Sequence, residues 1–536
     1  MKFHNIYKLI LCLAVGVFLL PSCNTDELQD LNINPQAVSE IDLNYLFSTA
    51  ELSLASGGGS GDNRYIDWRT NIGLAAGAIQ QVTTVGGISS NGNYYTHNEE
   101  TSAAPFEFTF QDQLKNIAEV LKQTGPDGYD AGNKVNMRNA ARILKAWSFA
   151  RLTDFYGSVP YTEANQGIEG IFFPAYDKQS FIYPDLLREL EEAVNGMSAS
   201  NPDDGFSSAD MIYQGDIAKW KRFGNSLMLR LAMRVSNVDA GLANNYVSKA
   251  IAGGVFTSND DNVWIPMAIG PSEWQDQNGI SRAFFPGDGG NPNHLSKTLI
   301  DFLKGTDPAS VDDDDPRLMI ISGGIYNWTP ADLTVLNDNP LDQIGVPPGF
   351  SKSDIDGIFG ADVIMDETFS RINTLMLDDD DPYMIMNYAE VEFLQAEALE
   401  RGIGSGISGS AQDHYNAGVR AAMQMYTPYD ASLVVSDAEV DAYLGQYPYG
   451  SRPALEMIGE QMWVSKFFNW WEAWNDWKRT GYPALVPFTS NESNETGGQI
   501  PRRLRYPAGE VASNPNFNQQ NNNNYTSRVW WDGGTE

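Results

Sequence analysis

The sequence predicts a mainly α-helical protein in which a helical scaffold supports long loops. Apolar residues recur at steps of three and four in several stretches, which is the period of a helix with one buried face. Between these stretches lie long segments rich in Gly, Pro, Asn and Asp, which are uncommon in a compact domain unless they serve binding. No linker or change of composition divides the 536 residues. One domain is therefore expected rather than two.

Three helices are expected in the first half of the chain, at 137–156, 180–197 and 216–236. Their spacing is close to the period of helix-turn-helix repeats, with only a loose match to the tetratricopeptide consensus. A second pair of helices is marked by two further stripes of apolar and small residues: Val391, Leu394 and Ala398, then Tyr415, Gly418, Ala422 and Met425. The glycine-rich stretch 402–409 between them predicts a turn. The small Gly418 and Ala422 indicate a close approach of two helices.

The long irregular segments lie at 56–66, 84–104, 256–294 and 322–366. They give the expected scaffold a loop-rich part, and function concentrates on such loops. The Asn-rich stretch 513–524 is low in complexity and is expected to form a surface loop.

The amino-terminal segment predicts export and a lipid anchor. The apolar run Ile10–Leu20 follows a positively charged start and is too short to span a bilayer comfortably. The Leu20-Pro21-Ser22-Cys23 sequence that follows resembles a bacterial lipobox, whose cysteine is lipidated. The other cysteine, Cys12, lies in the segment to be removed, so Cys23 has no disulfide partner in the mature chain. We expect a lipoprotein signal peptide at 1–22 and a tether at 23–40; the alternative is an ordinary secretory signal with an incidental cysteine.

Composition excludes some classes of partner. The formal net charge of -34 disfavours nucleic acid, whose phosphates would be repelled, and binding to anionic lipid through surface charge. The apolar runs after Leu20 are short and broken by charge, so no other segment is expected to cross a membrane. A hydrophobic content of 42% is ample for a large core.

Eight segments in order resemble one family, the SusD/RagB-type outer-membrane lipoproteins, in its SusD-like branch. The segments are LNINPQAVSE (31–40), ILKAWSFARLTDFYGSVPYTEA (143–164), PAYDKQSFIYPDLLRELEEAV (174–194), GDIAKWKRFGNSLMLRLAMRVS (215–236), DPRL (315–318), NYAEVEFLQAEALERG (387–402), EAWNDWKRTGYPAL (472–485) and IPRRLRYPAGEVASN (500–514). The similarity covers nearly the whole mature chain. The extra acid in VDDDDPRL and the Asn-rich tail after 515 depart from the family pattern.

The resemblance implies a fold, a partner and a function. It implies one α-helical domain over 23–536, with tetratricopeptide-like helix pairs packed against a loop-rich, ligand-binding half. Such proteins are lids on a TonB-dependent barrel of the SusC type. They capture oligosaccharides, or in some members peptides, and are not enzymes. With the acidic Asp26-Glu27 after the cysteine, it implies a lipid-anchored protein facing the cell surface at the outer membrane.

Two sets of aromatic residues could bind ligand. Trp463, Phe467, Trp470, Trp474 and Trp477 follow a helical period, and we interpret them as a core stripe in preference to a stacking platform for sugar rings. Aromatics in or beside the long loops are the better candidates, because exposed rings there tend to tuck in or to serve binding. These candidates are Trp274 and Trp328 first, then Tyr326, Trp68, Tyr94, Tyr95 and Trp264. Their neighbours Asp276, Asn278 and Asn327 could bind hydroxyls or peptide amides.

No cofactor is expected. The acidic runs 312–315 and 378–381 could supply oxygens to Ca²⁺, but neither has EF-hand spacing, and solvated turns are the preferred interpretation. An outer-membrane lipoprotein glycoside hydrolase is the alternative function, with Glu390, Glu392 and Glu397 as the carboxylates on offer. A purely structural helical-repeat adaptor is a third. The choice between glycan and peptide stays open.

Overall fold

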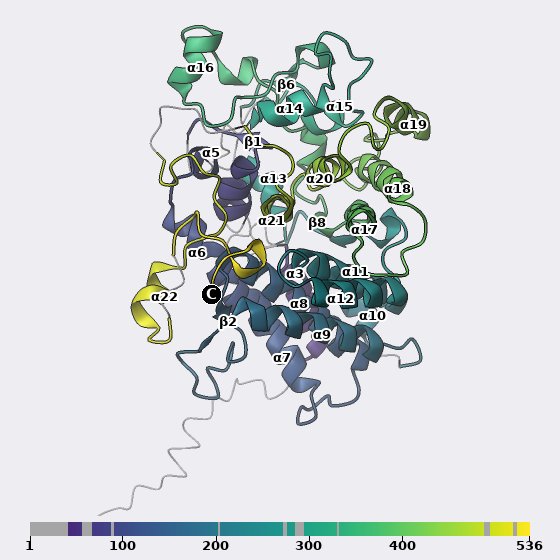
Figure 1. The fold of residues 1–536 in the computed structure, drawn as a ribbon. Coiled ribbons are helices and arrows are strands. Elements are labelled where there is room, and N and C mark those ends of the chain that lie inside the picture. The colour runs from purple at the N-terminus through teal and green to yellow at the C-terminus, as the bar shows by residue number, and fades with distance from the viewer. Residues whose placement is uncertain are drawn as a thin grey trace, which may run out of the picture. The chain divides into compact units, whose positions relative to one another are not determined.

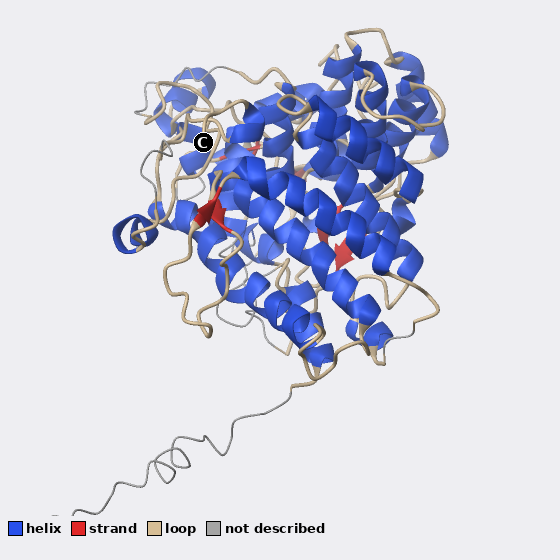
Figure 2. Ribbon diagram, turned by 60° about the horizontal axis from the view of Figure 1, so that its bottom comes forward, coloured by secondary structure: helices blue, strands red, loops and turns tan. Residues whose placement is uncertain are grey.

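A computed structural model describes residues 41–55, 67–86, 90–201, 204–271, 276–284, 294–329, 332–486, 494–517 and 523–536. Helices dominate these residues and the strands are few and short (Figure 2), which confirms the mainly α-helical prediction. Among the described helices, none combines the length and the apolar run needed to cross a bilayer.

The helices and strands carry the labels of Figure 1. The α-helices are α3 (Leu43–Leu52), α5 (Ser90–Tyr94), α6 (Glu99–Phe108), α7 (Lys115–Gln123), α8 (Val135–Tyr156), α9 (Gln179–Gly196), α10 (Phe206–Ala209), α11 (Ile217–Arg234), α12 (Ala240–Gly253), α13 (Gly279–Phe284), α14 (Lys297–Leu303), α15 (Leu318–Ser322), α16 (Lys352–Phe359), α17 (Tyr388–Arg401), α18 (Ala411–Met423), α19 (Asp437–Gln446), α20 (Ala454–Ser465), α21 (Trp470–Thr480) and α22 (Ala508–Ser513). The π-helices are η2 (Asp67–Ala76) and η3 (Thr109–Leu114), and the 3-10 turns are η4 (Asn259–Asp261), η6 (Pro340–Asp342), η7 (Met365–Glu367), η8 (Thr374–Met376) and η9 (Trp530–Asp532). The strands are β1 (Val82–Thr83), β2 (Val159–Pro160), β3 (Tyr176–Asp177), β4 (Val263–Ile265), β5 (His294–Leu295), β6 (Ile325–Tyr326), β7 (Val335–Asn337) and β8 (Tyr383–Met386).

The first helical block consists of α8, α9, α11 and α12, which pack in series in the lower part of Figure 1. Helices α8, α9 and α11 are the three expected from the apolar period at 137–156, 180–197 and 216–236, with ends shifted by one or two residues. Helix α11 passes so close to α9 that a Cβ on Gly224 would lie 2.4 Å from a methyl of Val194. The packing therefore requires glycine at position 224.

The second helical block consists of α17, α18 and α20, and α17 also contacts α11 of the first block. Helix α17 ends at Arg401, and the next residue, Gly402, has a φ of +64°, the left-handed conformation that glycine favours after a helix. A Cβ on Gly418 of α18 would lie 2.6 Å from the ring of Phe393 on α17, which confirms that the two helices approach closely.

The tryptophan-rich stretch 463–477 belongs to the core, as expected, but it does not form one continuous helix. Helix α20 ends at Ser465 and α21 begins at Trp470, and Phe468 between them has a φ of +75°. The buried indoles donate to core acceptors: Trp463 to the Ile79 carbonyl at 3.0 Å, Trp470 to Gln81 Oε1 at 2.9 Å and Trp474 to the Pro501 carbonyl at 2.8 Å. These rings brace the framework and are closed to solvent.

The described strands form four two-stranded antiparallel pairs: β1 with β5 and β4 with β8 join segments distant in sequence, and β2 with β3 and β6 with β7 join nearby ones. The stretches 256–294 and 322–366, expected to be irregular, contain short strands of this kind, and 84–104 contains α5 and the start of α6. The fourth such stretch, 56–66, lies outside the described residues. These elements are too short to show a clear period in the sequence.

The last described segment returns to the first helical block. Trp531 is fully buried; its indole donates to Asp154 Oδ1 at 2.7 Å, and its backbone N–H donates to Gln179 Oε1 at 3.1 Å. Glu536 accepts from the backbone and hydroxyl of Ser180 at 2.7 and 2.6 Å. Residues Leu43–Glu536 form one compact unit, and its last described segment packs on α8 and α9.

Candidate ligand-binding face

Short backbone pairings gather the long loops into one part of the molecule. Leu295 of β5 pairs with Val82 of β1, donates to the Ser370 carbonyl at 3.0 Å, and accepts from the Val346 amide at 2.9 Å. Segments more than 200 residues apart in sequence therefore meet around β5. We call the segments 80–86, 90–97, 276–284, 294–296, 324–329 and 344–371 the loop half.

Tyr326 and Trp328 are brought together in the loop half, with ring centroids 5.8 Å apart in an edge-on arrangement. The Trp328 indole donates to the Phe284 carbonyl at 3.2 Å, and the Arg371 guanidinium lies 4.7 Å from its ring centroid. Trp328 is 7% exposed and Tyr326 is 2% exposed. Both rings therefore pack within the protein, and their contact with ligand stays a prediction.

Tyr94 and Tyr95 occupy the end of α5 and the residue after it. Tyr94 is half-buried and its hydroxyl donates to the Phe350 carbonyl at 3.1 Å, which ties α5 to the start of α16. Tyr95 is buried with a φ of +54°, and burial raises the pKa of its hydroxyl to about 12. Of the two rings, Tyr94 is the more open to solvent.

Trp68 and Trp264 are half-buried and lie on different elements. Trp68 is on π-helix η2, with the Arg69 guanidinium 5.8 Å from its ring centroid. Trp264 is on β4 and meets Tyr429 edge-on at 5.6 Å. Trp274 and Cys23 lie outside the described residues, so their roles stay predictions.

Two of the polar neighbours named with these aromatics have structural partners. Asn278 is buried, caps α13 through bonds from the Ile280 and Ser281 amides, and donates to the Asp381 carbonyl at 3.0 Å. The Asn327 side chain donates to Asp332 Oδ2 at 2.6 Å. The sequence could not distinguish these turn-forming amides from ligand-binding ones, because both kinds lie in Asn-rich and Asp-rich loops.

A charged cluster of Asp366, His294 and Arg371 links the loops next to Trp328. Asp366 accepts from His294 Nε2 at 3.2 Å and also pairs with Arg371. Burial alone would raise the pKa of Asp366, but the hydrogen bonds and charges of His294 and Arg371 lower it to about 2. The carboxylate is therefore charged at neutral pH and joins η7 to β5.

The two acidic runs are turns, as expected, but they are not fully solvated: Asp313 and Asp315 are buried in the first run and Asp381 in the second. Asp315 pairs with Arg317 at 2.6 Å, and Asp313 accepts from the Thr306 amide at 2.7 Å. Asp381 accepts from the Asp378 amide at 2.9 Å, and burial raises its pKa to about 7. Within the described ranges, no group of three or more His, Cys, Asp or Glu is placed to hold a metal ion.

The carboxylates offered for glycoside hydrolysis face the protein interior. Glu390 holds Arg230 through two bonds of 2.6 Å, Glu397 holds Arg479, and Glu392 pairs with His414 Nδ1 at 2.6 Å. Glu390 and Glu397 are 1% and 3% exposed. Glu390 and Glu397 therefore pair with buried arginines, and Glu392 pairs with the half-buried imidazole of His414.

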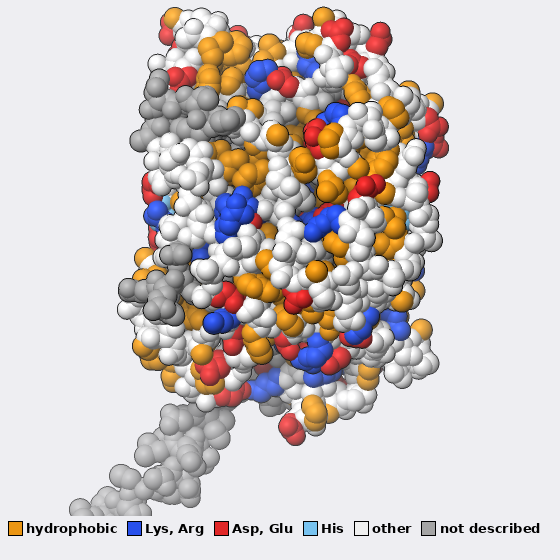
Figure 3. Space-filling model, viewed as in Figure 1, with side chains coloured by type: hydrophobic (Ala, Val, Ile, Leu, Met, Phe, Trp, Pro, Cys, Tyr) orange, Lys and Arg blue, Asp and Glu red, His pale blue; other side chains and the backbone are white. Residues whose placement is uncertain are grey.

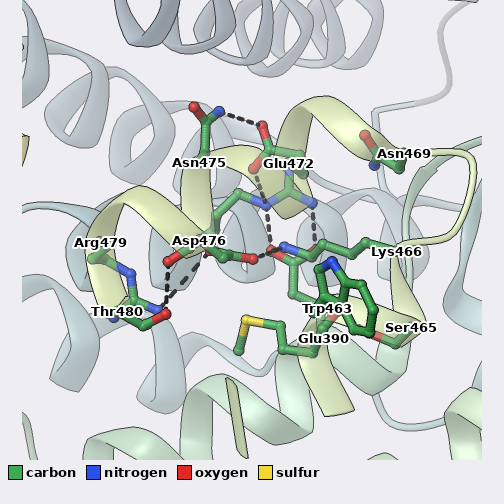
Figure 4. A network of polar contacts seen from close by, with 12 residues as sticks. Glu390, Trp463, Ser465, Lys466, Asn469, Glu472, Asn475, Asp476, Arg479 and Thr480 are labelled. Atoms are coloured by element: carbon green, nitrogen blue, oxygen red, sulfur yellow. Dashed lines mark hydrogen bonds and ion pairs between the residues drawn. The ribbon is translucent and has the colours of Figure 1, made fainter. Parts of the chain in front are cut away.

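Glu390 belongs to a network of buried ion pairs between α11, α17, α20 and α21 (Figure 4). Lys466 lies between Glu390, at 3.0 Å, and Asp476, and the Asn475 amide donates to Glu472 at 3.3 Å. Because acids and cations alternate at contact distance, each charge has a partner inside the low-dielectric interior.

The network extends to groups whose pKa values are displaced by burial. Burial raises the pKa of Asp154 to about 6, although Arg234 opposes the shift. Burial lowers the pKa of Lys478 to about 7. Such shifts often mark active sites, but structural ion pairs produce them too. Asp154 and Lys478 are 1% and 3% exposed, so we assign the network to the framework.

The turn between α8 and α9 was not among the predicted sites, yet it exposes the largest apolar side chains of its neighbourhood. Ile168 is 89% exposed, Phe172 75% and Phe173 54%. A hollow of about 910 Å³, lined by α7, Lys145, Phe149 and 161–169, lies on one side of the turn. A second hollow of about 560 Å³ lies on the other, between the turn, Phe106, Phe110 and α22. The GIFFPA sequence is the only signal that could have indicated it.

The fold defines the class of the protein: a helical-repeat scaffold with a loop-rich half. Residues 35–507 match the model of the SusD-like family described as starch-binding and associating with the outer membrane. The chain belongs to this family, and the resemblance inferred from its eight segments is confirmed.

Solved structures agree. A structure described as a chitin-binding protein is 31% identical, with a TM-score of 0.77, over 92% of this chain and 100% of that one. A Bacteroidetes SusD-like protein is 25% identical with a TM-score of 0.76, over 92% and 100% of the two chains. A chitin-binding SusD homolog from Flavobacterium johnsoniae, 22% identical over 91% and 98% with a TM-score of 0.69, shows the same fold. No curated protein matches the chain.

Proposed function

We propose that the protein is a lipid-anchored, cell-surface binding protein that captures oligosaccharides and delivers them to a SusC-type TonB-dependent transporter. The observation that carries the proposal is the relative described as chitin-binding, which is 31% identical and matched over its full length. The family description adds starch binding and association with the outer membrane. Chitin oligosaccharides are therefore the first ligands to test, ahead of starch oligosaccharides and peptides.

The loop half supports this function through its aromatic residues. A carbohydrate site needs flat apolar rings with polar groups at their edges, held by a rigid scaffold. The loop half supplies half-buried Tyr94 beside α16. Trp274 is outside the described residues, and its part in the site is a prediction from the sequence. The carboxylates proposed for hydrolysis are used in ion pairs, which favours binding without turnover.

Calorimetry of the mature chain 23–536 tests the proposal with chitohexaose, maltoheptaose and a panel of peptides. Saturable binding of a glycan, without release of reducing ends, is expected. Binding of peptides alone would select the peptide alternative, and release of reducing ends would select the glycoside hydrolase. Mass spectrometry of the membrane-extracted protein is expected to find acyl chains on Cys23.

Point variants test the site. Trp274→Ala and Tyr94→Ala are expected to weaken glycan binding about tenfold or more, because truncating a central aromatic costs on the order of 2 kcal/mol. Tyr45→Ala is the matched control, since Tyr45 is 73% exposed on α3, outside the loop half. Equal affinities for all three variants and the unaltered protein would remove the site assignment.

A further inference from the structure

The second hollow, beside the turn between α8 and α9, has the form of a binding site. Its apolar walls come from three separate parts of the chain: Phe106 and Phe110, then Pro160, Phe172 and Pro174, then Pro507. Its volume of about 560 Å³ falls in the range of small-molecule sites. In Figure 3, orange apolar side chains reach the surface at the lower left of the molecule, below α22, with red carboxylates nearby.

The turn that presents Phe172 is fixed by the protein. The β2–β3 pair closes its base, and Asp177 accepts from the Thr162 amide and hydroxyl at 2.8 and 2.9 Å. The Ala175 amide donates to Glu163 Oε2 at 2.8 Å across the turn. The Asn165 side chain donates to the Phe110 carbonyl at 3.2 Å, which ties the turn to η3. The turn that carries the exposed rings is therefore ordered before any ligand arrives, which lowers the entropy lost on binding.

The polar groups of the second hollow select the chemistry of its ligand. Glu107, Glu163 and Glu510 line it together with the amides of Gln111, Asn165 and Gln166, and its described lining contains no Lys or Arg. Carboxylates accept hydrogen bonds from hydroxyls and repel anions. The first hollow differs, because Lys115, Lys122 and Lys145 line it. The second hollow therefore suits a neutral ligand with many hydroxyl donors and an apolar face.

We propose that the second hollow is an additional carbohydrate site, in which a pyranose ring stacks on Phe172 and donates hydroxyls to Glu163 and Glu510. Only Oε2 of each carboxylate has a hydrogen-bond partner among the described residues: the Ala175 amide for Glu163, and the Tyr176 hydroxyl and Asn514 amide for Glu510. Each Oε1 can accept from a ligand. This proposal rests on the proposed function, because it assigns the same class of ligand to a second place on the chain.

A second site would raise the apparent affinity of the protein for a polysaccharide. A chain long enough to reach both sites binds the second one at a high effective concentration, which raises the apparent affinity well above that of either site alone. Short oligosaccharides occupy one site at a time. The second hollow is therefore expected to matter more for the polysaccharide than for the short ligand.

The test compares Phe172→Ala and Glu163→Gln with Ile168→Ala, which removes an exposed apolar side chain of the same turn but lines only the first hollow. The probes are colloidal chitin and chitohexaose. Phe172→Ala and Glu163→Gln are expected to lower the affinity for colloidal chitin about tenfold. Ile168→Ala is expected to change nothing. Hydrogen exchange of the unaltered protein with chitohexaose is expected to show protection within 161–174.

The outcomes separate the two proposals. If the unaltered protein binds neither probe, chitin is not its ligand and the second chitin site is overturned, while the calorimetry with maltoheptaose still decides the proposed function. If it binds both, while the three variants match it and 161–174 gains no protection, the second site is overturned and the proposed function stands. If Phe172→Ala instead reduces only co-purification with the transporter, the turn is a protein-docking surface and the second site is overturned. Melting temperatures exclude misfolding as the cause.

Discussion

Replacing Glu390 by Gln is expected to destabilise the protein strongly, because Glu390 neutralises two buried cations. It holds Arg230 through two bonds of 2.6 Å and lies 3.0 Å from Lys466, and all three side chains are buried. Burial alone would raise the pKa of Glu390, but Arg230 and Lys466 hold it below its ordinary value. The carboxylate is therefore charged at pH 7, and its loss leaves excess positive charge in the interior.

Breaking a buried ion pair by removing one partner costs about 3–5 kcal/mol. The unfolding entropy is about 2.1 cal/mol/K per residue, so about 500 residues give about 1 kcal/mol/K. Glu390→Gln should therefore lower Tm by about 3–5 °C in scanning calorimetry at pH 7. The control is Asp437→Asn, which breaks the pair with Arg420 at 2.6 Å; because Asp437 is exposed and solvent screens this pair, the control should lower Tm far less.

A Glu390→Gln variant that melts with the Asp437→Asn control would refute this reasoning. It would mean that the excess charge is relieved by water entry or by rearrangement of Arg230 and Lys466. In that case the network of Figure 4 contributes geometry but little stability.

Two further predictions follow from the helical framework. Gly418→Ala should destabilise the protein by about 1–3 kcal/mol in chemical unfolding, because its Cβ would lie 2.6 Å from Phe393. The control Gly445→Ala on α19 has open space around its Cβ and should stabilise the protein by about 0.5–1 kcal/mol. Similar effects of the two substitutions would contradict the close α17–α18 contact. Burial lowers the pKa of Lys478 to about 7. Between pH 7 and 10 the unfolded chain therefore keeps a proton on Lys478 that the folded protein has released. Because of this difference, the free energy of unfolding rises by about 1.4 kcal/mol per pH unit in that range. Lys478→Met should remove that slope in urea titrations, and an unchanged slope would show that Lys478 stays charged when folded.

The scaffold was predictable from the sequence because long helices repeat their apolar stripe several times. The stripes at 137–156 and 216–236 correspond to α8 and α11 within two residues. The break between α20 and α21 was not predictable, because the aromatic residues keep the helical period across Phe468 while the backbone there adopts a φ of +75°. Tertiary packing of the bulky rings decides that conformation, and a local pattern does not report it.

The candidate site was less predictable than the scaffold. Trp328 and Tyr94 both lie in or beside Gly-rich and Asn-rich stretches, yet one ring is buried against Arg371 and the other is half-open beside Phe350. Composition places an aromatic on a loop but does not say whether the loop folds back over it. The exposure of Phe172 was not predictable either. The turn that presents it is held by contacts with η3 and β3, which the local sequence does not indicate.

The hydrogen bond from Trp531 to Asp154 joins residues 377 positions apart. At about 5–20 residues per second, a ribosome needs roughly 20–75 s to add the second partner after the first. During that interval Asp154 lacks the indole donor of Trp531, and Gln179 lacks its backbone N–H donor. The first helical block is therefore made before two of its contacts can form. If the protein is exported as proposed, this delay keeps the first helical block without its contacts to Trp531 while the chain reaches the export channel.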